Sequence, residues 1–408
     1  MRVGIDGLHL FGNYAGIQYS LARLVEALRR ECPQDEIVLY VPRDFAGPPA
    51  EGTWKSGDTI PNSRELGSCP PISGDPGLIV KRTWFPGRWR TIRTLWRNMR
   101  LQARAYKDRC DLLHGPTYAL PALVSIPAVV TIHDVIAFTH PAFCTPGSAR
   151  VQGQVIPRSV AAARRIIVPT AATKEQLLRS VKQADPNRID VVPWGVGNEF
   201  QPLKAFKPLS NSGREEARRA LNLPDQYVLF VGNIEPKKNI PMLIQAFFAA
   251  KMNRKLPHKL VLAGQMGWGM KNLAKLIRNL KASDYVFFTG YVQQKALPVL
   301  YNLADLLVMP SQVEGFGMPV LEAMACGCPV VISDDAALRE VCGAAARVVP
   351  DDPAKPLQPL RQAIEELLLS DARARQELVK LGFERAKQFT WEKTARLVHE
   401  TYERALGS

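Results

Sequence analysis

The stretch Ser311-Gln-Val-Glu-Gly-Phe-Gly-Met-Pro-Val-Leu-Glu-Ala-Met-Ala-Cys-Gly327 decides the fold of this chain. An apolar run at 305–310 comes directly before it, and a second run at 329–332 follows. Short apolar runs with β-branched residues are typical of strands buried on both faces. The stretch is therefore predicted to form a loop and a short helix between two such strands, with Pro319 in the first turn of the helix.

Two glycines in this loop predict a site for anions and hydroxyls. Gly315 and Gly317 allow backbone dihedrals and close approaches that a Cβ would forbid. The backbone amides of Phe316, Gly317 and Met318 are then expected to point into a cleft at the positive end of the following helix.

Two glutamates frame the same loop. Glu314 lies in the loop, and Glu322 follows about one turn inside the helix, with seven residues between them. Ionised carboxylates only accept hydrogen bonds, so the pair suits two sets of hydroxyls on one polyhydroxylated ligand. Alternatively, Glu314 favours the helix dipole and Glu322 lies on a solvated helix face. The surrounding G-F-G-M-P and A-C-G favour the ligand site.

This string resembles the retaining glycosyltransferases of family 4, whose E-x7-E element is usually written E-G-F-G-x-P-x-L-E-A-M-A-x-G-x-P-V. Glu314 and Glu322 occupy its two acidic positions, and the resemblance covers nearly the whole chain. It implies a fold of the glycosyltransferase B type, in which two Rossmann-like domains face an interdomain cleft.

The order of strands and helices independently predicts an α/β fold with two domains. A chain of 408 residues exceeds the size at which single cores stop growing. Strands alternate with helices in both halves, which indicates two doubly wound parallel sheets. A Pro- and Lys-containing segment near residue 202 resembles a linker. We place the domain boundary near residue 200, and the resemblance implies an acceptor-side domain at 1–200 and a nucleotide-sugar-binding domain at 201–389. The resemblance implies that a last helix, 390–408, packs back on the first domain.

Charge and cysteine content limit the partners and the compartment. The net charge of +15 indicates anionic partners such as nucleotides, phospholipid headgroups or nucleic acid. Seven cysteines without regular spacing form neither a disulfide framework nor a zinc site. No apolar run reaches the roughly 18 residues of a membrane span, and the N-terminus enters a strand without a signal peptide. We expect a cytoplasmic protein, and peripheral contact with the inner face of the cell membrane is an alternative.

Much of the positive charge lies between Lys81 and Arg109, where ten of 29 residues are Lys or Arg. Two stripes run through this segment at helical spacing. The apolar stripe is Ile92, Leu95, Trp96, Met99, Ala103 and Tyr106, and the basic stripe is Arg90, Arg93, Arg97, Arg100, Arg104 and Lys107. One interpretation is a helix that packs its apolar stripe on a sheet and solvates its basic face. The other is a membrane-surface helix on anionic lipid.

Two further site residues are expected in the first half. Gly16 lies where a first strand turns into a first helix, as in phosphate-binding turns of doubly wound folds. The resemblance implies that the loop at 14–17 faces the cleft near the donor phosphates and the acceptor. His133 ends a predicted strand at 128–134, at the sheet edge where ligands bind. The resemblance implies that it contacts the donor sugar, although a capped strand-end histidine is the common alternative.

Three residues after the first strand of the second half complete the predicted site. Lys237 and Lys238 would neutralise the diphosphate, which leaves with two negative charges. The resemblance assigns this role to Lys238 and usually places an arginine where this chain has Asn233. Asparagine donates a hydrogen bond but carries no charge. Otherwise the two lysines belong to a basic surface turn.

These features predict a retaining glycosyltransferase that moves a mannose- or glucose-type hexose from a GDP- or UDP-linked donor to a glycan or lipid-linked acceptor. Glu314, His133 and Lys238 are the expected catalytic residues. The chain has no D-x-D motif, so no metal is expected. No other cofactor and no nucleic-acid partner are expected either. A polysaccharide acceptor is an expectation from the breadth of the family. The alternatives are another enzyme of the same fold, such as a sugar-nucleotide epimerase, or a non-catalytic basic membrane-binding protein.

Overall fold

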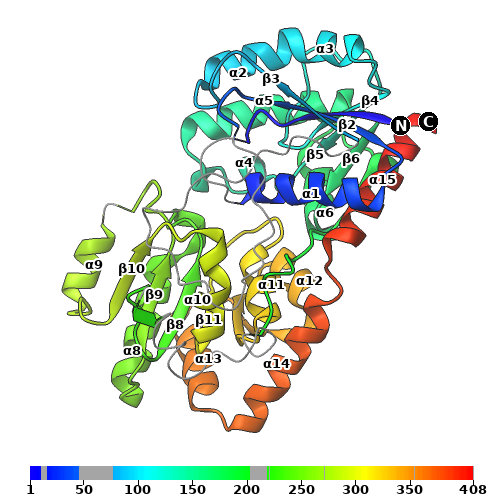
Figure 1. Ribbon diagram of the computed structural model, residues 1–408. Coiled ribbons are helices and arrows are strands. Elements are labelled where there is room, and N and C mark those ends of the chain that lie inside the picture. Colours follow the sequence, from blue (N-terminus) through cyan, green and yellow to red (C-terminus); the bar gives the residue numbers. More distant parts are fainter. Residues whose placement is uncertain are drawn as a thin grey trace. The chain divides into compact units, whose positions relative to one another are not determined.

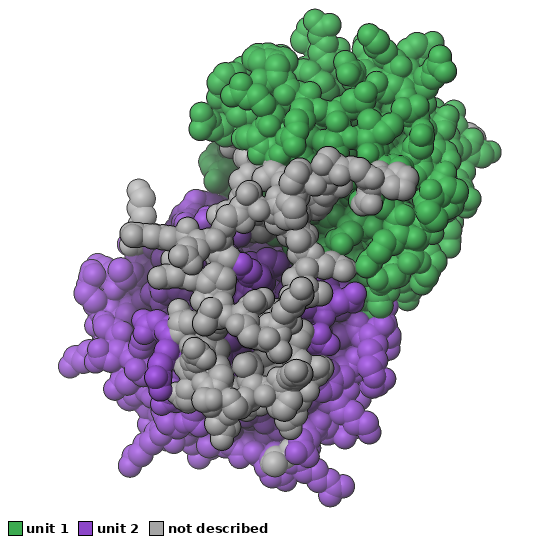
Figure 2. Space-filling view, viewed as in Figure 1, with its two compact units in different colours: residues 1–51, 67–195, 389–408 green, residues 52–66, 196–388 purple. Residues whose placement is uncertain are grey.

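The computed structural model describes residues 1–10, 16–45, 77–202, 218–219, 221–270, 272–352 and 354–407. These residues belong to two compact units, coloured green and purple in Figure 2. The chain passes from unit 1 to unit 2 between residues 195 and 196, and returns to unit 1 between residues 388 and 389.

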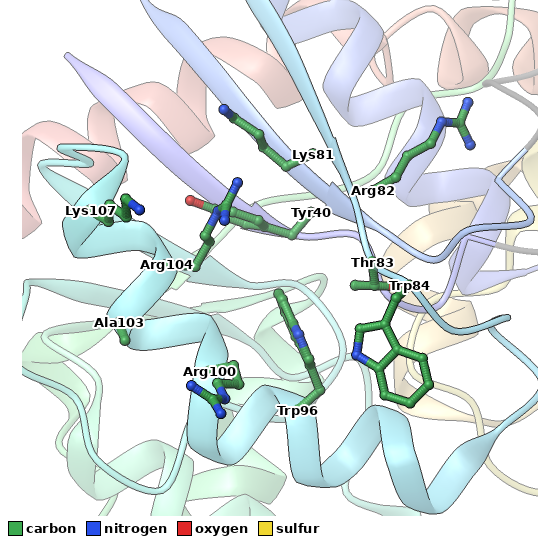
Figure 3. Close-up of a pocket in the computed structure, with 10 residues that line it drawn as sticks. All are labelled: Tyr40, Lys81, Arg82, Thr83, Trp84, Trp96, Arg100, Ala103, Arg104 and Lys107. Carbon is green, nitrogen blue, oxygen red and sulfur yellow. The ribbon is translucent and has the colours of Figure 1, made fainter.

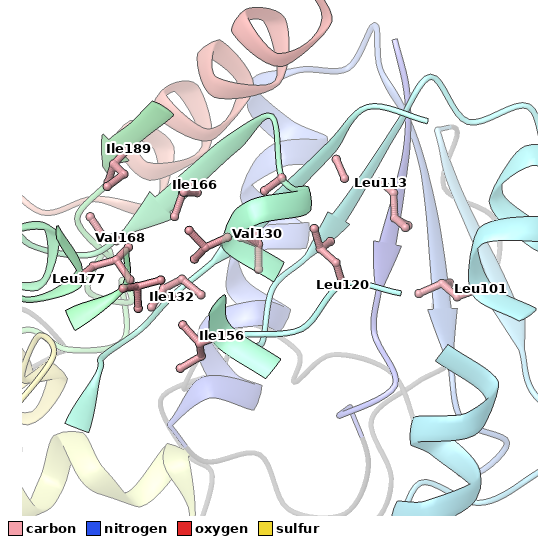
Figure 4. Packing of buried hydrophobic residues seen from close by; sticks show 14 of the residues in the cluster. Leu101, Leu113, Leu120, Val130, Ile132, Ile156, Ile166, Val168, Leu177 and Ile189 are labelled. Carbon is pink, nitrogen blue, oxygen red and sulfur yellow. The ribbon is translucent and has the colours of Figure 1, made fainter. Parts of the chain in front are cut away.

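Unit 1 is built on a parallel sheet of seven strands in the order β3-β2-β1-β4-β5-β6-β7 (Figure 1). The strands are β1 Arg2–Asp6, β2 Glu36–Val41, β3 Leu78–Arg82, β4 Leu112–Gly115, β5 Ala128–Thr131, β6 Arg165–Val168 and β7 Ile189–Val191. The helices are α1 Ile17–Glu31, α2 Arg90–Trp96, α3 Gln102–Lys107, α4 Ile136–Thr139, α5 Pro146–Ala162, α6 Ala171–Ser180 and α15 Trp391–Gly407. Aliphatic residues of the central strands, such as Val130 and Ile166, form its core with Leu101 and Ile156 (Figure 4).

Unit 2 has a parallel sheet of six strands in the order β10-β9-β8-β11-β12-β13. The strands are β8 Tyr227–Val231, β9 Lys259–Ala263, β10 Val286–Gly290, β11 Leu306–Met309, β12 Val330–Ser333 and β13 Arg347–Val349. The helices are α8 Ile240–Arg254, α9 Leu273–Asn279, α10 Leu297–Leu303, α11 Met318–Ala325, α12 Ala336–Cys342, α13 Gln358–Leu369 and α14 Ala372–Ala386. The prediction of two doubly wound parallel sheets is confirmed.

Helix α15 packs within unit 1 although it lies at the end of the chain. Its side chains at Trp391, Ala395, Val398 and Tyr402 are buried and form an apolar stripe at helical spacing. The Tyr402 hydroxyl lies 2.8 Å from Nδ1 of the buried His114 in β4. In the parts of the chain that the structure describes, no helix has the length and apolarity needed to cross a bilayer.

The basic segment differs from the expected packed amphipathic helix. A π-helical turn at Arg97–Leu101 separates α2 from α3. Arg93 and Arg97 are buried, whereas Leu95, Met99 and Tyr106 of the predicted apolar stripe are exposed. The interpretation in which the apolar stripe covers the sheet and the basic stripe is solvated is therefore wrong for these residues.

A buried ion pair explains why an arginine, rather than a residue of the apolar stripe, faces the sheet. The Arg97 guanidinium binds Asp6 at the end of β1, and the two side chains are 7% and 1% exposed. A carboxylate buried at the end of a strand requires a cation because an unpaired buried charge is expensive. Meeting this requirement directs Arg97, rather than an apolar neighbour, toward the sheet.

Arg97→Met should lower the free energy of unfolding by about 3 kcal/mol or more, since removing one partner of a buried ion pair leaves the other uncompensated. Urea denaturation at pH 7 measures the change. Arg347→Met is the matched control, because Arg347 and its partner Glu366 are both about half exposed, and such pairs contribute about 1 kcal/mol or less. Equal losses in the two variants would show that the Arg97 pair has no special role.

Candidate active site

The loop after β8 carries Lys237 and Lys238 at the carboxyl end of the unit 2 sheet. It leaves β8 through Gly232, whose φ is 144°. A Cβ on Gly264, at the end of β9, would lie 1.9 Å from the carbonyl oxygen of Gly232, so only glycine fits there. The loop then forms a 3-10 turn at Pro236–Lys238 and enters α8. This tight backbone positions both lysines.

The predicted loop at 311–317 connects β11 to α11 beside the lysine loop. The Gln312 amide donates to the Lys237 carbonyl at 2.8 Å, which joins the two loops. Gly317 has a φ of 98°, and a Cβ there would lie 2.5 Å from Cδ2 of Leu338 in α12. Both the left-handed backbone and the close side chain require glycine at the start of α11.

Lys238 and Glu314 meet directly across these loops. The Lys238 ammonium forms a hydrogen-bonded ion pair with Oε1 of Glu314, and the two side chains are 11% and 8% exposed. Burial raises the pKa of Glu314, but the nearby charges of Lys238 and Lys237 outweigh this effect and leave the pKa below its ordinary value. Glu314 is therefore ionised at neutral pH, and its negative charge is matched by a lysine.

Glu322 has a different environment one turn inside α11. It is 5% exposed, and its Oε2 accepts a hydrogen bond of 2.7 Å from the Tyr301 hydroxyl of α10. Burial, only partly offset by this bond, raises the pKa of Glu322 from 4.5 to about 7. The alternative that places Glu322 on a solvated helix face is therefore wrong.

Glu322→Gln should stabilise the protein at pH 8 but have little effect at pH 4.5. With a pKa of about 7 when folded and 4.5 when unfolded, Glu322 binds fewer protons in the unfolded chain between these values, so stability falls as pH rises. Glutamine removes this loss, about 3 kcal/mol at pH 8, and its amide oxygen can still accept from Tyr301. Denaturant unfolding at both pH values, with exposed Glu366→Gln as control, measures it. A pH-independent difference would contradict the raised pKa.

The remaining predicted residues of unit 2 lie on the same two loops. Asn233, which follows Gly232 at the end of β8, is exposed, and Lys237 is half-buried with its Nζ 3.6 Å from Oε1 of Glu235. Phe316 is buried, and the half-buried Met318 begins α11. The structure thus places these residues at one end of the six-stranded sheet, with a matched ion pair between the loops.

Gly16 caps the amino end of α1 in unit 1. Its φ is 53°, and an added Cβ would meet no atom within 4 Å. Backbone conformation, rather than crowding, therefore makes glycine suitable there. Residues 14 and 15 of the predicted phosphate loop lie outside the described residues.

His133 also belongs to unit 1, two residues beyond the end of β5, which is shorter than predicted. Its Nε2 lies 2.8 Å from the Pro116 carbonyl oxygen and must donate a proton to it. Burial lowers the pKa of His133 despite this bond. The neutral ring therefore presents Nδ1 as an acceptor. Tyr118 and Trp194 hold the ring, with centroids 5.4 and 5.5 Å away.

Among the described residues, one group of metal-ligand types occurs, in unit 1. Cys32, Asp35 and His399 have ligand atoms within 4.8 Å of one another. Asp35 already pairs with the Met1 ammonium and with Nδ1 of His399, each at 2.8 Å. Burial raises the pKa of the Cys32 thiol to about 11. We assign the group to polar contacts of Asp35 with the Met1 ammonium and with His399 of α15.

Known protein families match both halves of the chain. The model described as Glycosyltransferase Family 4 matches residues 14–200, and that described as Glycosyl transferases group 1 matches residues 213–384. O-antigen chain mannosyltransferase B of Escherichia coli is 32% identical over 296 residues, which cover 72% of this chain and 74% of that protein. The chain belongs to glycosyltransferase family 4.

A further relative agrees with this assignment, and solved structures share the fold. D-inositol 3-phosphate glycosyltransferase of Kineococcus radiotolerans is 30% identical over 334 residues, covering 75% of this chain and 74% of that protein. Sucrose-phosphate synthase of Thermosynechococcus elongatus has a TM-score of 0.72 at 22% identity, covering 98% of each chain. Anabaena HepE, solved with UDP and glucose, has a TM-score of 0.69 at 18% identity, covering 99% of each chain. The glycosyltransferase B fold is confirmed, and the protein is a sugar-transferring enzyme.

Two residues of the glycosyltransferase's site region were not predicted. Oδ2 of Asp335 accepts from the Glu314 amide at 3.3 Å, while its Oδ1 caps α12 by accepting from the Leu338 amide at 2.9 Å. An aspartate directly before a helix can be predicted as a helix cap from the sequence. Its bond to the Glu314 amide is a tertiary contact, which the local sequence does not reveal. Tyr301, the partner of Glu322, lies in an apolar helix and gives no distinguishing sequence signal.

Proposed function

We propose that this enzyme is a retaining hexosyltransferase that uses a nucleoside diphosphate sugar and a glycan or lipid-linked acceptor. The observation that carries the proposal is the buried pair of Lys238 and Glu314. It places a cation and a hydroxyl acceptor next to each other at the ligand-binding end of a doubly wound sheet. A sugar diphosphate requires both groups at adjacent positions.

Lys238 would stabilise the diphosphate as it leaves. Negative charge grows on the phosphate oxygens during bond cleavage, and a preorganised cation in a buried site stabilises it strongly. Lys237, the exposed Asn233 and the backbone amides of Phe316, Gly317 and Met318 would complete the phosphate and sugar contacts. Gly16 would bring the amino end of α1 near the donor, as proposed for the loop at 14–17.

The two glutamates would bind different hydroxyls of the donor. Glu314 is ionised and would accept from the transferred sugar, and Glu322 would accept from the ribose. Because the pKa of Glu322 is about 7 in the free protein, ribose hydroxyls that donate to the carboxylate would favour its ionised form. Nδ1 of the neutral His133 would accept from a sugar hydroxyl and face positive charge developing near the anomeric carbon.

Transfer with retention of the anomeric configuration, but without a nucleophile from the protein, is consistent with this arrangement. Retaining hydrolases usually use one carboxylate of a close pair as a nucleophile. Here the charge of Glu314 is engaged by Lys238, and Glu322 is held by Tyr301. Attack on the same face as the departing diphosphate, assisted by that diphosphate, therefore suits the site better.

The names of similar proteins support the choice of donor. The Escherichia coli relative is a mannosyltransferase, and HepE was solved with UDP and glucose. We therefore propose a GDP- or UDP-linked mannose or glucose. The proposed site supplies its own cations through Lys237 and Lys238, so we further propose that transfer requires no metal and no other cofactor.

The protein should release nucleoside diphosphate from one such donor only when a suitable acceptor is present, and the product should keep the donor's anomeric configuration. Chromatography of the nucleotide and NMR of the product measure the two outcomes. Activity should persist in excess EDTA. Epimerised donor without transfer, an inverted product or loss of activity in EDTA would each overturn the corresponding part of the proposal.

Lys238→Ala should lower kcat on the order of 10²-fold while changing donor affinity much less, because the ammonium acts most strongly as the leaving group gains charge. Steady-state kinetics and direct donor titration separate the two quantities. Lys275→Ala, at an exposed position of α9, is the matched control and should leave both unchanged. A folded Lys238→Ala protein with full kcat would exclude this role for Lys238.

A further inference from the structure

A basic cavity in unit 1 shares no lining residue with the residues assigned to donor chemistry. Its volume is about 540 Å³, and it opens between strands β2 and β3 and the segment from α2 to α3 (Figure 3). It is lined by Tyr40, Lys81, Arg82, Thr83, Trp84, Trp96, Arg100, Ala103, Arg104 and Lys107. In Figure 3, Lys81, Arg104 and Lys107 gather at one end and the rings of Trp84 and Trp96 at the other.

The cavity carries more positive charge than its neighbours neutralise. Asp108 is shared by Lys81 and Arg104, with nitrogen–oxygen distances of 3.6 and 3.3 Å. Arg100 and Lys107 are exposed and have no acidic partner among the residues that the structure describes. A cavity with these unmatched cations attracts phosphate or another anion.

Large apolar side chains are exposed on the segment that borders the cavity, from Trp84, which lines it, to Tyr106. Trp84, Trp89, Leu95, Met99 and Tyr106 have exposed fractions between 43% and 72%. The rings of Trp84 and Trp89 lie edge to face, with centroids 6.3 Å apart. Exposed apolar residues are common singly, but a group of this size beside a basic cavity indicates an interaction surface.

The helix register explains why these groups lie together. Arg93, Arg97, Leu101 and Ala105 are buried at steps of four residues. Leu95 follows Arg93 by two positions, and Met99 follows Arg97 by two positions. Both therefore lie on the opposite side of the helix from the buried residues. Three residues line the cavity, and each follows a buried residue by three positions: Trp96, Arg100 and Arg104. The outward face is therefore apolar, and the adjacent face is basic.

We propose that this basic–aromatic surface, formed by Trp84, Trp89, Leu95, Met99, Arg100, Arg104, Tyr106 and Lys107, docks on an anionic phospholipid leaflet. Lipid phosphates would occupy the cavity, and the apolar side chains would enter the headgroup layer. Amphipathic surfaces with Lys or Arg beside Trp and Leu bind membranes in this way. The proposal rests on unit 1 alone and does not depend on the proposed transfer reaction.

The aliphatic side chains favour lipid over other anions. A phosphorylated glycan or a single-stranded nucleic acid could use the cations and stack on the tryptophans. Neither offers an apolar environment to Leu95 and Met99, which are 53% and 69% exposed. A leaflet offers phosphates and an acyl boundary side by side, so it matches both faces of the segment.

Co-sedimentation of the full chain with vesicles tests this proposal. The protein should bind vesicles of phosphatidylcholine with phosphatidylglycerol, release them as salt rises, and bind pure phosphatidylcholine weakly. R100Q/K107Q should weaken binding roughly 25-fold, given the usual contribution of two cations near an anionic leaflet. L95S/M99S should weaken it roughly tenfold.

Matched controls exclude general effects of charge and apolarity. R373Q/K380Q removes two exposed cations from α14, and L369S/L381S removes two exposed leucines from unit 2. Both should bind vesicles as the parent protein does. Thermal shifts with nucleotide sugars should be the same in R100Q/K107Q and the parent, which separates docking from donor binding.

Three results would overturn the proposal. They are equal binding to neutral and anionic vesicles, unchanged binding by R100Q/K107Q, or equal losses in the test and control variants. Binding of an oligonucleotide or phosphorylated glycan through Arg100 and Lys107, without vesicle binding, would assign the surface to that partner instead.

Discussion

The ion pair between Lys238 and Glu314 is the interaction on which the proposed chemistry depends. Each side chain alone would be an uncompensated charge in a buried place. Together they hold a cation and an acceptor ready without reorganisation. The backbone bond from Gln312 to the Lys237 carbonyl joins the same two loops. Electrostatics and loop geometry therefore stabilise one arrangement, and a charged sugar nucleotide would meet groups that are already oriented.

The two glutamates show how one short stretch can produce different acids. Glu314 is kept ionised by lysines, whereas burial beside Tyr301 brings the pKa of Glu322 to about 7. Glu314 lies in the loop and Glu322 in the helix that directly follows it. The difference between their pKa values therefore arises from the side chains around each carboxylate. In the proposed reaction, acceptors of unequal charge would suit two kinds of hydroxyl and the later release of the nucleotide.

Sequence patterns predicted both sheets because parallel strands are continuous apolar runs, and they predicted the loop at 311–317 because its glycines and Pro319 have few alternatives. The edge strand β3 was missed, since it ends in Lys81 and Arg82 and is only half-buried. The inward turn of Arg97 was also missed. Its cause, the charge of Asp6, lies 91 residues away in sequence, and helical periodicity carries no information about such a partner. Tyr301 escaped prediction for the same reason.

The π-helical turn at Arg97–Leu101 also has a geometric effect. In a regular α-helix, positions four residues apart drift by about 40° at each step, so lines of like residues wind around the cylinder. A wider turn reduces that drift. Arg93, Arg97, Leu101 and Ala105 can then stay in one row against the sheet, and the opposite row stays straight as well. This single turn thus helps to keep the buried row against the sheet on both of its sides, which leaves Leu95 and Met99 together on the exposed side.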